Sequence, residues 1–274
     1  MGGRAGRTPE EEPRLRGRLP VLWRSATEVQ VGTDPRWSVA LSDLTPGAVR
    51  ALGGVPASAE RRTLVAAMRR AGCAEAEVRS VLAHLAAAHL LVPPVHPDAS
   101  GDEGAWALVD GRGDGGSTSA RRAGGSVAVH GLGRTGTAIA ATLAAAGVGT
   151  VVLVDDGSVT RHDVGVGGLR VEDVGLARTA AVGRLLLGVA PGVRTIATGH
   201  ADLTVLVEHH AADPVRYSAL HDAGRAHLSV VVREASVLVG PLVRPGATAC
   251  LRCVDLARSR RDDRWPAVAA QLAR

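Results

Sequence analysis

The sequence predicts a two-part protein: a small α+β unit, followed by a larger α/β domain with a mostly parallel sheet. Three observations support this division. Two segments with helical periodicity lie between residues 60 and 88, a glycine-rich turn follows an apolar run after residue 126, and apolar runs alternate with helical patterns from there to about residue 240.

Composition limits the chemistry of the chain. Of its 274 residues, 46% are hydrophobic, but only 2% are aromatic and none is Phe, so the core must consist mainly of Val, Leu and Ala. The chain has no Lys, so Arg carries the fixed positive charge. Every mechanism that needs a catalytic, Schiff-base or phosphate-loop lysine is therefore excluded.

Residues 1–19 are rich in Arg, Glu, Pro and Gly, which predicts a disordered tail. This segment has no apolar stretch of the kind found in secretory signals. The longest weakly polar stretch, residues 138–154, is interrupted by Gly147 and Gly149 and is typical of a helix plus a strand. We therefore expect a cytoplasmic protein without a membrane partner, and its three cysteines predict no disulfide framework.

Residues 20–93 are expected to form a winged-helix-like domain. Loose alternation over residues 22–41, with a turn at residues 32–35, predicts a β-hairpin. Helices are expected near residues 60–71 and 74–88, and a short strand at residues 89–92. Because glutamates alternate with arginines along both helices, nucleic acid is a disfavoured partner.

Residues 94–125 are rich in Gly, Asp and Ser, and we expect a linker there. A short apolar patch at residues 106–109 could add an edge strand to a sheet. The α/β domain is expected to occupy residues 126–274.

The start of this domain has the pattern of a nucleotide-binding βαβ unit. Gly131, Gly133 and Gly136 follow a β-rich run and open an Ala-rich helical segment. Gly131 permits a tight turn, Gly133 lets a phosphate approach the backbone, and Gly136 allows close packing of helix and strand. Asp155 ends the next apolar run, nineteen residues after Gly136, where a ribose hydroxyl would be bound. With Asp156 beside it, this pattern predicts a Rossmann-like layer.

Further strands are expected near residues 193–197, 203–207, 228–232 and 237–239, with helices near residues 174–187 and 214–223. This alternation predicts a parallel sheet covered on both faces.

Four segments in order resemble the ThiF/MoeB family, the bacterial relatives of ubiquitin-activating enzymes. They are Asp155-Asp156-Gly157-Ser158-Val159, Asp173-Val174-Gly175, Gly240-Pro241-Leu242-Val243 and the Cys250-x-x-Cys253 pair. The resemblance covers about residues 126–253. It implies a protein that binds ATP with Mg²⁺ and adenylates the C-terminal carboxylate of a small partner protein.

Several functional positions of the family differ here. The family's Asn falls at Asp163, its Arg at Val166, its Gln at Gly167 and its Lys at Arg178. The family's metal-holding acid falls near Glu208, with His209 at the matching position and His210 after it.

The resemblance implies Arg178, Glu208 and Arg161 as catalytic candidates, with Arg161 or Arg170 standing in for the missing arginine. Adenylation needs positive charge on the α-phosphate and an acid to hold the metal. The substitutions favour a degenerate domain over an active adenylyltransferase.

Cys250 and Cys253 have the spacing of half a tetrahedral zinc site. The family completes this site with a second pair further along the chain, so the resemblance implies zinc and a domain that is incomplete at its C-terminus. Structural zinc, a redox pair and two thiols without a ligand all stay open. Cys73 is interpreted as a small packing residue.

Three possibilities remain for the function. In azole-forming (TOMM) cyclodehydratase systems, a ThiF-like scaffold is fused to an N-terminal unit that binds the leader of a precursor peptide as an added strand. Such a scaffold implies a cyclodehydratase partner, and the edge would come from residues 28–31 or 39–41. The alternative is an active enzyme that adenylates a peptide or a sulfur-carrier-like protein. We also expect a homodimer, and a domain that serves only for dimerisation is the third possibility.

Overall fold

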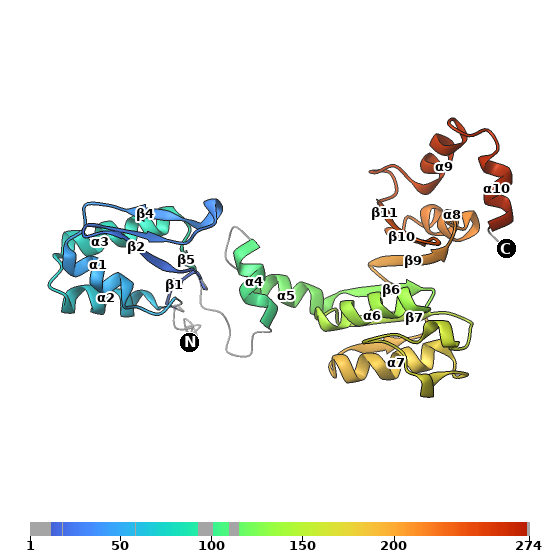
Figure 1. The fold of residues 1–274 in the computed structure, drawn as a ribbon, viewed down its shortest axis with the longest axis horizontal. Coiled ribbons are helices and arrows are strands. Elements are labelled where there is room, and N and C mark those ends of the chain that lie inside the picture. Colours follow the sequence, from blue (N-terminus) through green and yellow to red (C-terminus); the bar gives the residue numbers. More distant parts are fainter. Residues whose placement is uncertain (1–11, 18, 58, 93–100, 110–114, 273–274) are drawn as a thin grey trace, which may run out of the picture. The chain divides into compact units, whose positions relative to one another are not determined.

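The computed structural model describes residues 12–17, 19–57, 59–92, 101–109 and 115–272. The chain forms two compact units, Met1–Ala120 and Arg121–Arg274 (Figure 1).

The first unit contains a three-stranded antiparallel sheet in the order β2-β3-β4. Val29 of β3 pairs with Trp23 on one side and with Leu41 on the other, so β3 is the central strand. A second, two-stranded sheet joins β1 to β5. The strands of the unit are β1 (Arg14–Leu15), β2 (Val21–Ser25), β3 (Glu28–Val31), β4 (Val39–Leu41) and β5 (Leu91–Val92).

Three helices pack on this sheet: α1 (Pro46–Gly53), α2 (Arg61–Arg70) and α3 (Glu75–Ala87). The Thr45 side chain caps α1 by accepting a hydrogen bond from the Ala48 amide, with Pro46 in the first turn. The buried core joins all of these elements through Val29, Val31, Leu41, Leu44, Leu52, Leu64, Met68, Val78, Val81 and Leu85. The expected helices and the strand at residues 89–92 are present.

Two expectations for this part of the chain are wrong. The tail was expected to run to residue 19, but Leu15 is buried in β1, and the buried Arg16 side chain stacks on Trp37 at 3.8 Å. Within the expected linker, α4 (Gly101–Val109) and α5 (Gly115–Gly124) are helices. Residues 106–109 therefore belong to a helix and not to an edge strand, and residues 94–100 and 110–114 of the expected linker lie outside the described ranges.

The second unit contains a six-stranded sheet in the order β11-β10-β9-β6-β7-β8. All neighbouring strands are parallel except β10 and β11. The strands are β6 (Ser126–His130), β7 (Thr150–Val154), β8 (Arg194–Ile196), β9 (Leu203–His209), β10 (His227–Val232) and β11 (Val237–Val243).

Helices cover both faces of this sheet. On one face, α6 (Arg134–Ala145) and α7 (Arg178–Val189) bury Ala140, Val182 and Leu186 against Val129 and Val151. On the other, α8 (Pro214–Asp222) and α9 (Leu251–Ser259) enclose Leu206, Tyr217, Val243 and Leu251. The predicted Rossmann-like architecture is confirmed.

One carboxylate holds the last helices in place. Asp255 of α9 accepts hydrogen bonds from the Tyr217 hydroxyl at 3.0 Å and from the indole N–H of Trp265 at 3.3 Å. Trp265 begins α10 (Trp265–Leu272). Burial and the Asp255 carboxylate raise the pKa of Tyr217 to about 12, so its hydroxyl stays a donor at neutral pH. Among the described residues, no helix has both the length and the apolar character needed to cross a membrane.

Candidate functional site

The three glycines of the turn after β6 differ in why the structure needs or allows glycine at that position. Gly131 has φ +87°, and an added Cβ would collide with the Val207 carbonyl oxygen. At Gly136, a Cβ would collide with the Gly131 carbonyl oxygen. Gly133 has an ordinary φ of −66°, and a Cβ there would meet only Asp163 Oδ1, at 3.3 Å. The backbone fold thus requires glycine at 131 and 136, whereas the space at Gly133 faces the pocket.

This pocket has a volume of about 700 Å³ and lies at the carboxyl ends of four parallel strands, β6, β7, β9 and β10. From β6 the chain adds β7 and β8 on one side of the sheet and then β9 and β10 on the other, so the strand order reverses between β6 and β9. Open α/β sheets bind ligands at such a point. The pocket is lined by Gly131, Gly133, Arg134, Thr135, Gly136, Asp155, Thr160, His162, Asp163, Arg178, Val207, His209, Val232, Arg233 and Glu234.

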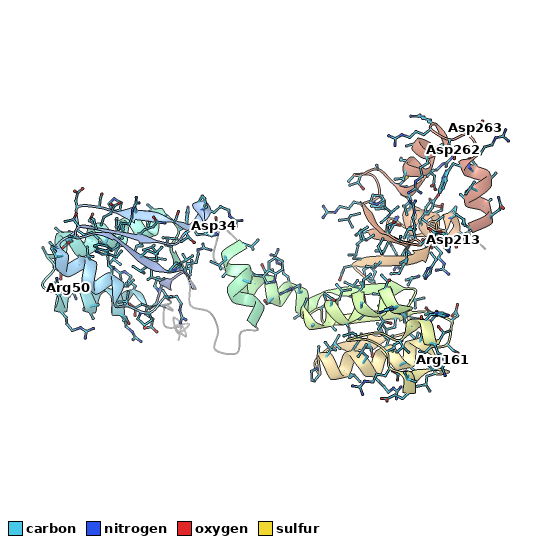
Figure 2. All side chains as sticks on the ribbon, viewed as in Figure 1. Asp34, Arg50, Arg161, Asp213, Asp262 and Asp263 are labelled. Carbon is cyan, nitrogen blue, oxygen red and sulfur yellow. The ribbon has the colours of Figure 1, made fainter. Side chains whose placement is uncertain are left out.

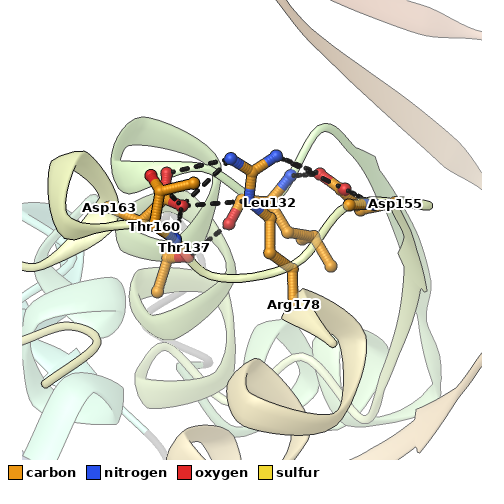
Figure 3. A network of polar contacts seen from close by, with 7 residues as sticks. Leu132, Thr137, Asp155, Thr160, Asp163 and Arg178 are labelled. Carbon is orange, nitrogen blue, oxygen red and sulfur yellow. Dashed lines mark hydrogen bonds and ion pairs between the residues drawn. The ribbon is translucent and has the colours of Figure 1, made fainter. Parts of the chain in front are cut away.

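Arg178, at the start of α7, joins two carboxylates inside the pocket (Figure 3). Its Nε and Nη2 donate to Asp163 at 3.0–3.2 Å, and its Nη1 lies 3.4 Å from Asp155 Oδ2. The side chains of Asp155 and Asp163 are 9% and 7% exposed, so both charges sit in a partly desolvated site. Arg178 therefore offsets one of the two negative charges beside it, and its donors are directed at these carboxylates, which leaves little capacity for a ligand.

Asp155 connects the glycine turn to the end of β7. Its Oδ2 accepts the Leu132 amide and its Oδ1 accepts the Gly157 amide, both at 2.7 Å. With Arg178 added, its lone pairs are used within the protein. The predicted ribose contact would have to displace one of these donors. Asp156 is exposed next to it, outside the residues that line the pocket.

Asp163 is held as an anion by its local bonds. Burial by itself would raise the pKa of this carboxyl, but the Thr160 amide, Arg178 and the Thr160 hydroxyl all bond it and together lower its pKa. The structure brings Asp163 and Arg178 together. Here they form an ion pair in which neither group stays available.

The other charged side chains of the pocket are two arginines, Arg134 and Arg233, and one carboxylate, Glu234. Arg134 follows Gly133 at the first turn of α6, and Arg233 directly follows β10. No hydrogen bond or ion pair engages either guanidinium within the described part of the chain. His162 and His209 add two imidazoles to the lining. The helix N-terminus and the two guanidinium groups favour an anion, whereas the Glu234 carboxylate in the same lining opposes one.

Glu208 is not in this pocket. Side chains alternate along β9, so Val207 and His209 face the pocket, whereas Glu208 faces α8 and accepts the Asp213 amide at 3.2 Å. Burial raises the pKa of Glu208, and its other carboxyl oxygen has no hydrogen-bond partner among the described groups. The catalytic role implied for Glu208 does not match this position.

The other arginine candidates also lie elsewhere. Arg161 is exposed on the loop after β7 and does not line the pocket (Figure 2). Arg170 pairs with Glu172 at 3.3 Å on the surface. The family's arginine position is occupied by Val166, which carries no charge and is fully exposed. Arg134 and Arg233, which sequence reasoning missed, supply the pocket's positive charge instead. The position of Arg134 directly after the second glycine was the available signal.

The pocket does not suit Mg²⁺, the metal that the family resemblance implies. Mg²⁺ prefers carboxylate and phosphate oxygens in an octahedral shell. Asp155 and Asp163 are both bonded to Arg178, and Glu234 is exposed and pairs with the His210 ring at 3.3 Å. His209 occupies the pocket where the family's acid would be expected.

Cys250 occupies the N-cap position of α9, and its sulfur lies 3.6 Å from that of Cys253. A backbone hydrogen bond, together with other local bonds, lowers the pKa of Cys250. The described residues contain no group of three or more His, Cys, Asp or Glu side chains that could hold a metal. Zinc at this pair would need ligands beyond those described.

A second candidate site lies in the first unit. A groove of about 490 Å³ runs between β4 and α3, and β4 is an edge strand of its sheet. Its lining includes the buried Leu41, Leu44 and Val81 and the exposed Asp43 and His84. Glu77 of α3 accepts hydrogen bonds from the Thr45 amide and hydroxyl, at 2.7 and 3.1 Å, and so fixes the loop after β4 to α3.

The second unit thus has the fold and the glycine turn of a nucleotide-binding Rossmann domain. Residues 108–223 match the model of the ThiF family. This match supports a ThiF-type domain over the matched segment, which is less than half of the chain. A comparison with curated protein sequences gives no significant match.

Solved structures share the fold over most of the chain. E. coli MccB with ATP aligns with a TM-score of 0.63 at 18% identity, covering 95% of this chain and 86% of MccB. The microcin C7 biosynthetic enzyme MccB in complex with N-formylated MccA gives 0.63 at 16% identity, with coverages of 96% and 83%. PaaA gives 0.65 at 19% identity, with coverages of 84% and 77%.

Proposed function

We propose that the protein binds the leader segment of a ribosomally made precursor peptide and presents it to a modifying enzyme, with the ThiF-type domain as scaffold. The observation that carries this proposal is the unpaired edge of β4 beside α3. An extended peptide placed there would add a fourth strand to the sheet and contact α3 with its side chains.

The groove has the chemistry that strand addition requires. Backbone groups on the outer side of β4 offer hydrogen bonds without side-chain specificity, and the apolar floor of Leu41, Leu44 and Val81 would take alternate peptide side chains. Asp43 at the rim favours a basic or neutral residue in the bound peptide. The clamp between Glu77 and Thr45 keeps one end of the groove in place before binding.

Nucleic acid is a weaker candidate for this unit. Arg62 and Arg69 of α2 form ion pairs with Glu60 and Glu75, which reduces their capacity to bind phosphates. MccB, which shares its fold with this chain, was solved in complex with N-formylated MccA, and this also favours a peptide. A cyclodehydratase partner and a homodimer remain part of this proposal.

An active adenylyltransferase is the alternative. Its chemistry would need a free cation at the α-phosphate and an acid for the metal, but Arg178 is bonded to two carboxylates and His209 replaces the acid. ATP–pyrophosphate exchange by the full chain with Mg²⁺ and the peptide would favour this alternative. We expect no exchange above background.

Peptide binding is tested with two matched variants on α3. Ala76 lines the groove and Ala86 does not, and both are exposed. Fluorescence anisotropy of a labelled precursor peptide encoded next to the gene should show binding by wild type and Ala86→Trp, and at least tenfold weaker binding by Ala76→Trp. Equal affinity of the two variants would contradict the proposed groove.

A further inference from the structure

We propose that a second groove of the first unit, between α2 and α3, docks an acidic amphipathic segment of a partner protein. This groove has a volume of about 570 Å³. It is distinct from the groove beside β4, because α3 contributes Ala76, Glu77 and Val81 to that groove and Val78, Arg79 and Leu82 to this one. The inference therefore does not depend on the capture of a leader peptide.

The charge of this groove is positive after its carboxylates are counted. Among the described residues, five arginines and two glutamates line it. Arg69 pairs with Glu75 at 2.6 Å, and Arg62 pairs with Glu60 at 2.5 Å and lies 3.5 Å from Glu12. Glu60 lies outside the lining and is the third carboxylate beside these arginines. The surplus is two positive charges.

Three of these arginines have no carboxylate partner. Within the described ranges, no ion pair engages Arg61, Arg70 or Arg79. The Nε atoms of Arg70 and Arg79 donate to the carbonyl oxygens of Ala66 and Glu75 in their own helices, both at 3.3 Å, and their other guanidinium donors have no partner in the described part of the chain. Arg61 begins α2 and Arg70 ends it, so these two cations are spaced by about 14 Å along the helix axis. The groove thus offers separated cations to carboxylates of a bound segment.

The apolar part of the lining indicates which class of acidic partner fits. Val78 is buried and Val65 and Leu82 are half-buried, and all three line the groove between the arginines of α2 and α3. Aliphatic surface of this kind is stabilised by burial against apolar side chains, which a phosphate backbone does not supply. The Glu12 and Glu75 carboxylates would also repel phosphates. A polypeptide segment with acidic and apolar side chains satisfies both parts of the lining.

Fluorescence anisotropy of the full chain with a labelled synthetic peptide tests this inference. The probe is a helical peptide of roughly eleven residues, or three turns, with Leu on one face and Glu on the other. We expect saturable binding that weakens as the salt concentration rises, because the arginines are exposed. Replacing Leu by Ser in the probe should weaken binding at least about tenfold, and replacing Glu by Lys should abolish it.

Matched arginine variants separate the groove from the general positive charge of the chain. Arg79→Glu should weaken binding of the probe at least about tenfold, because a charge-assisted contact becomes a repulsion. Arg50, labelled in Figure 2, is an exposed arginine of α1 that lines neither groove. Arg50→Glu should bind the probe as wild type does.

Matched tryptophan variants test the position without a change of charge. Ala66 lines this groove and Ala76 lines the groove beside β4, and both are exposed. Ala66→Trp should weaken binding of the probe at least about tenfold, because the indole occupies the space that apolar side chains of the probe would fill. Ala76→Trp should leave it unchanged.

Four results would overturn the inference. Equal binding by Arg79→Glu and Arg50→Glu would mean attraction to the net charge of +5 alone. Loss of binding in Ala76→Trp but not in Ala66→Trp would place the probe in the other groove. The absence of saturable binding up to millimolar probe, or tighter binding of a DNA duplex that Arg79→Glu removes, would also contradict it. None of these results bears on the binding of a precursor peptide beside β4.

Discussion

At the scale of single residues, Arg178 is the cation that pairs with both buried carboxylates of the pocket in the second unit. It contacts Asp163 and Asp155 together and holds the loop after β7 against the glycine turn. In this chain the cation is used for the structure of the pocket.

Replacing Arg178 by Ala should destabilise the protein by roughly 2 kcal/mol, because two poorly solvated carboxylates lose their partner. This is less than for a fully buried pair, since the Arg178 side chain remains 24% exposed. Urea unfolding measures the change. Arg170→Ala, which removes a surface pair with Glu172, should change the stability by no more than about 0.5 kcal/mol.

The effect of Arg178→Ala should also depend on pH. The pKa of Asp163 is lowered in the folded state, so its stabilising contribution is present above the unfolded value of 3.8 and is lost as the pH falls through the folded pKa. The difference between wild type and variant should therefore shrink below about pH 4. A constant difference from pH 7 to pH 3 would contradict this role of Asp163.

Glu208 should give a pH dependence of the opposite sign. Because burial raises its folded pKa above 4.5, the proton it holds favours the folded state, and that contribution is lost as the pH rises through the folded pKa. Glu208→Gln cannot lose this proton, so wild type should lose stability relative to the variant as the pH rises above 4.5. Glu234→Gln, at an exposed carboxyl whose pKa is lowered, should not show this trend. Thermal unfolding across this pH range is the measurement.

At the scale of elements, the order of the strands in the first unit decides which strand lies at the edge of the sheet. The sequence alternation predicted strands at residues 28–31 and 39–41 but could not tell which was the edge, because pairing between strands depends on contacts distant in sequence. The structure makes β3 the central strand and leaves β4 at the edge. Only β4 can therefore receive a peptide strand beside α3.

Val29→Pro should unfold the first unit instead of selectively removing peptide binding. Val29 is buried and pairs on both sides, so proline would remove a ladder hydrogen bond from the middle of the sheet. The expected cost is about 3 kcal/mol or more. Circular dichroism during urea unfolding should show an early transition. A variant with wild-type stability would mean that β3 is not the central strand.

The whole molecule shows what local patterns can and cannot predict. The glycine turn and the alternation after it predicted the parallel sheet, because its turns and apolar runs are local signals. The helices α4 and α5 were missed because their Gly- and Ser-rich segments have low helix propensity. Glu208 was expected at the site from the family resemblance. Its side chain points away from the pocket because the register of β9 decides which residues face which side, and the sequence alone did not define that register.

Charge balance in the pocket was also beyond the sequence. The sequence showed that Val166 and Gly167 replace the family's Arg and Gln. It did not show that Arg134 and Arg233 lie in one pocket, because that depends on the start of α6 and the end of β10 lying together at the carboxyl ends of the strands. The two candidate sites belong to different units, and each unit has its own hydrophobic core. The groove of the first unit and the pocket of the second can therefore be altered separately by mutation.

Amide hydrogen exchange of the full chain, with and without the precursor peptide, tests the central claim most directly. Strand addition at the edge should slow exchange in β4 (residues 39–41) because outward-facing amides gain hydrogen bonds, with little change in β2 at the opposite edge. Protection confined to β2, or to the pocket around Gly131–Gly136, or no protection by a peptide that binds, would contradict peptide capture between β4 and α3.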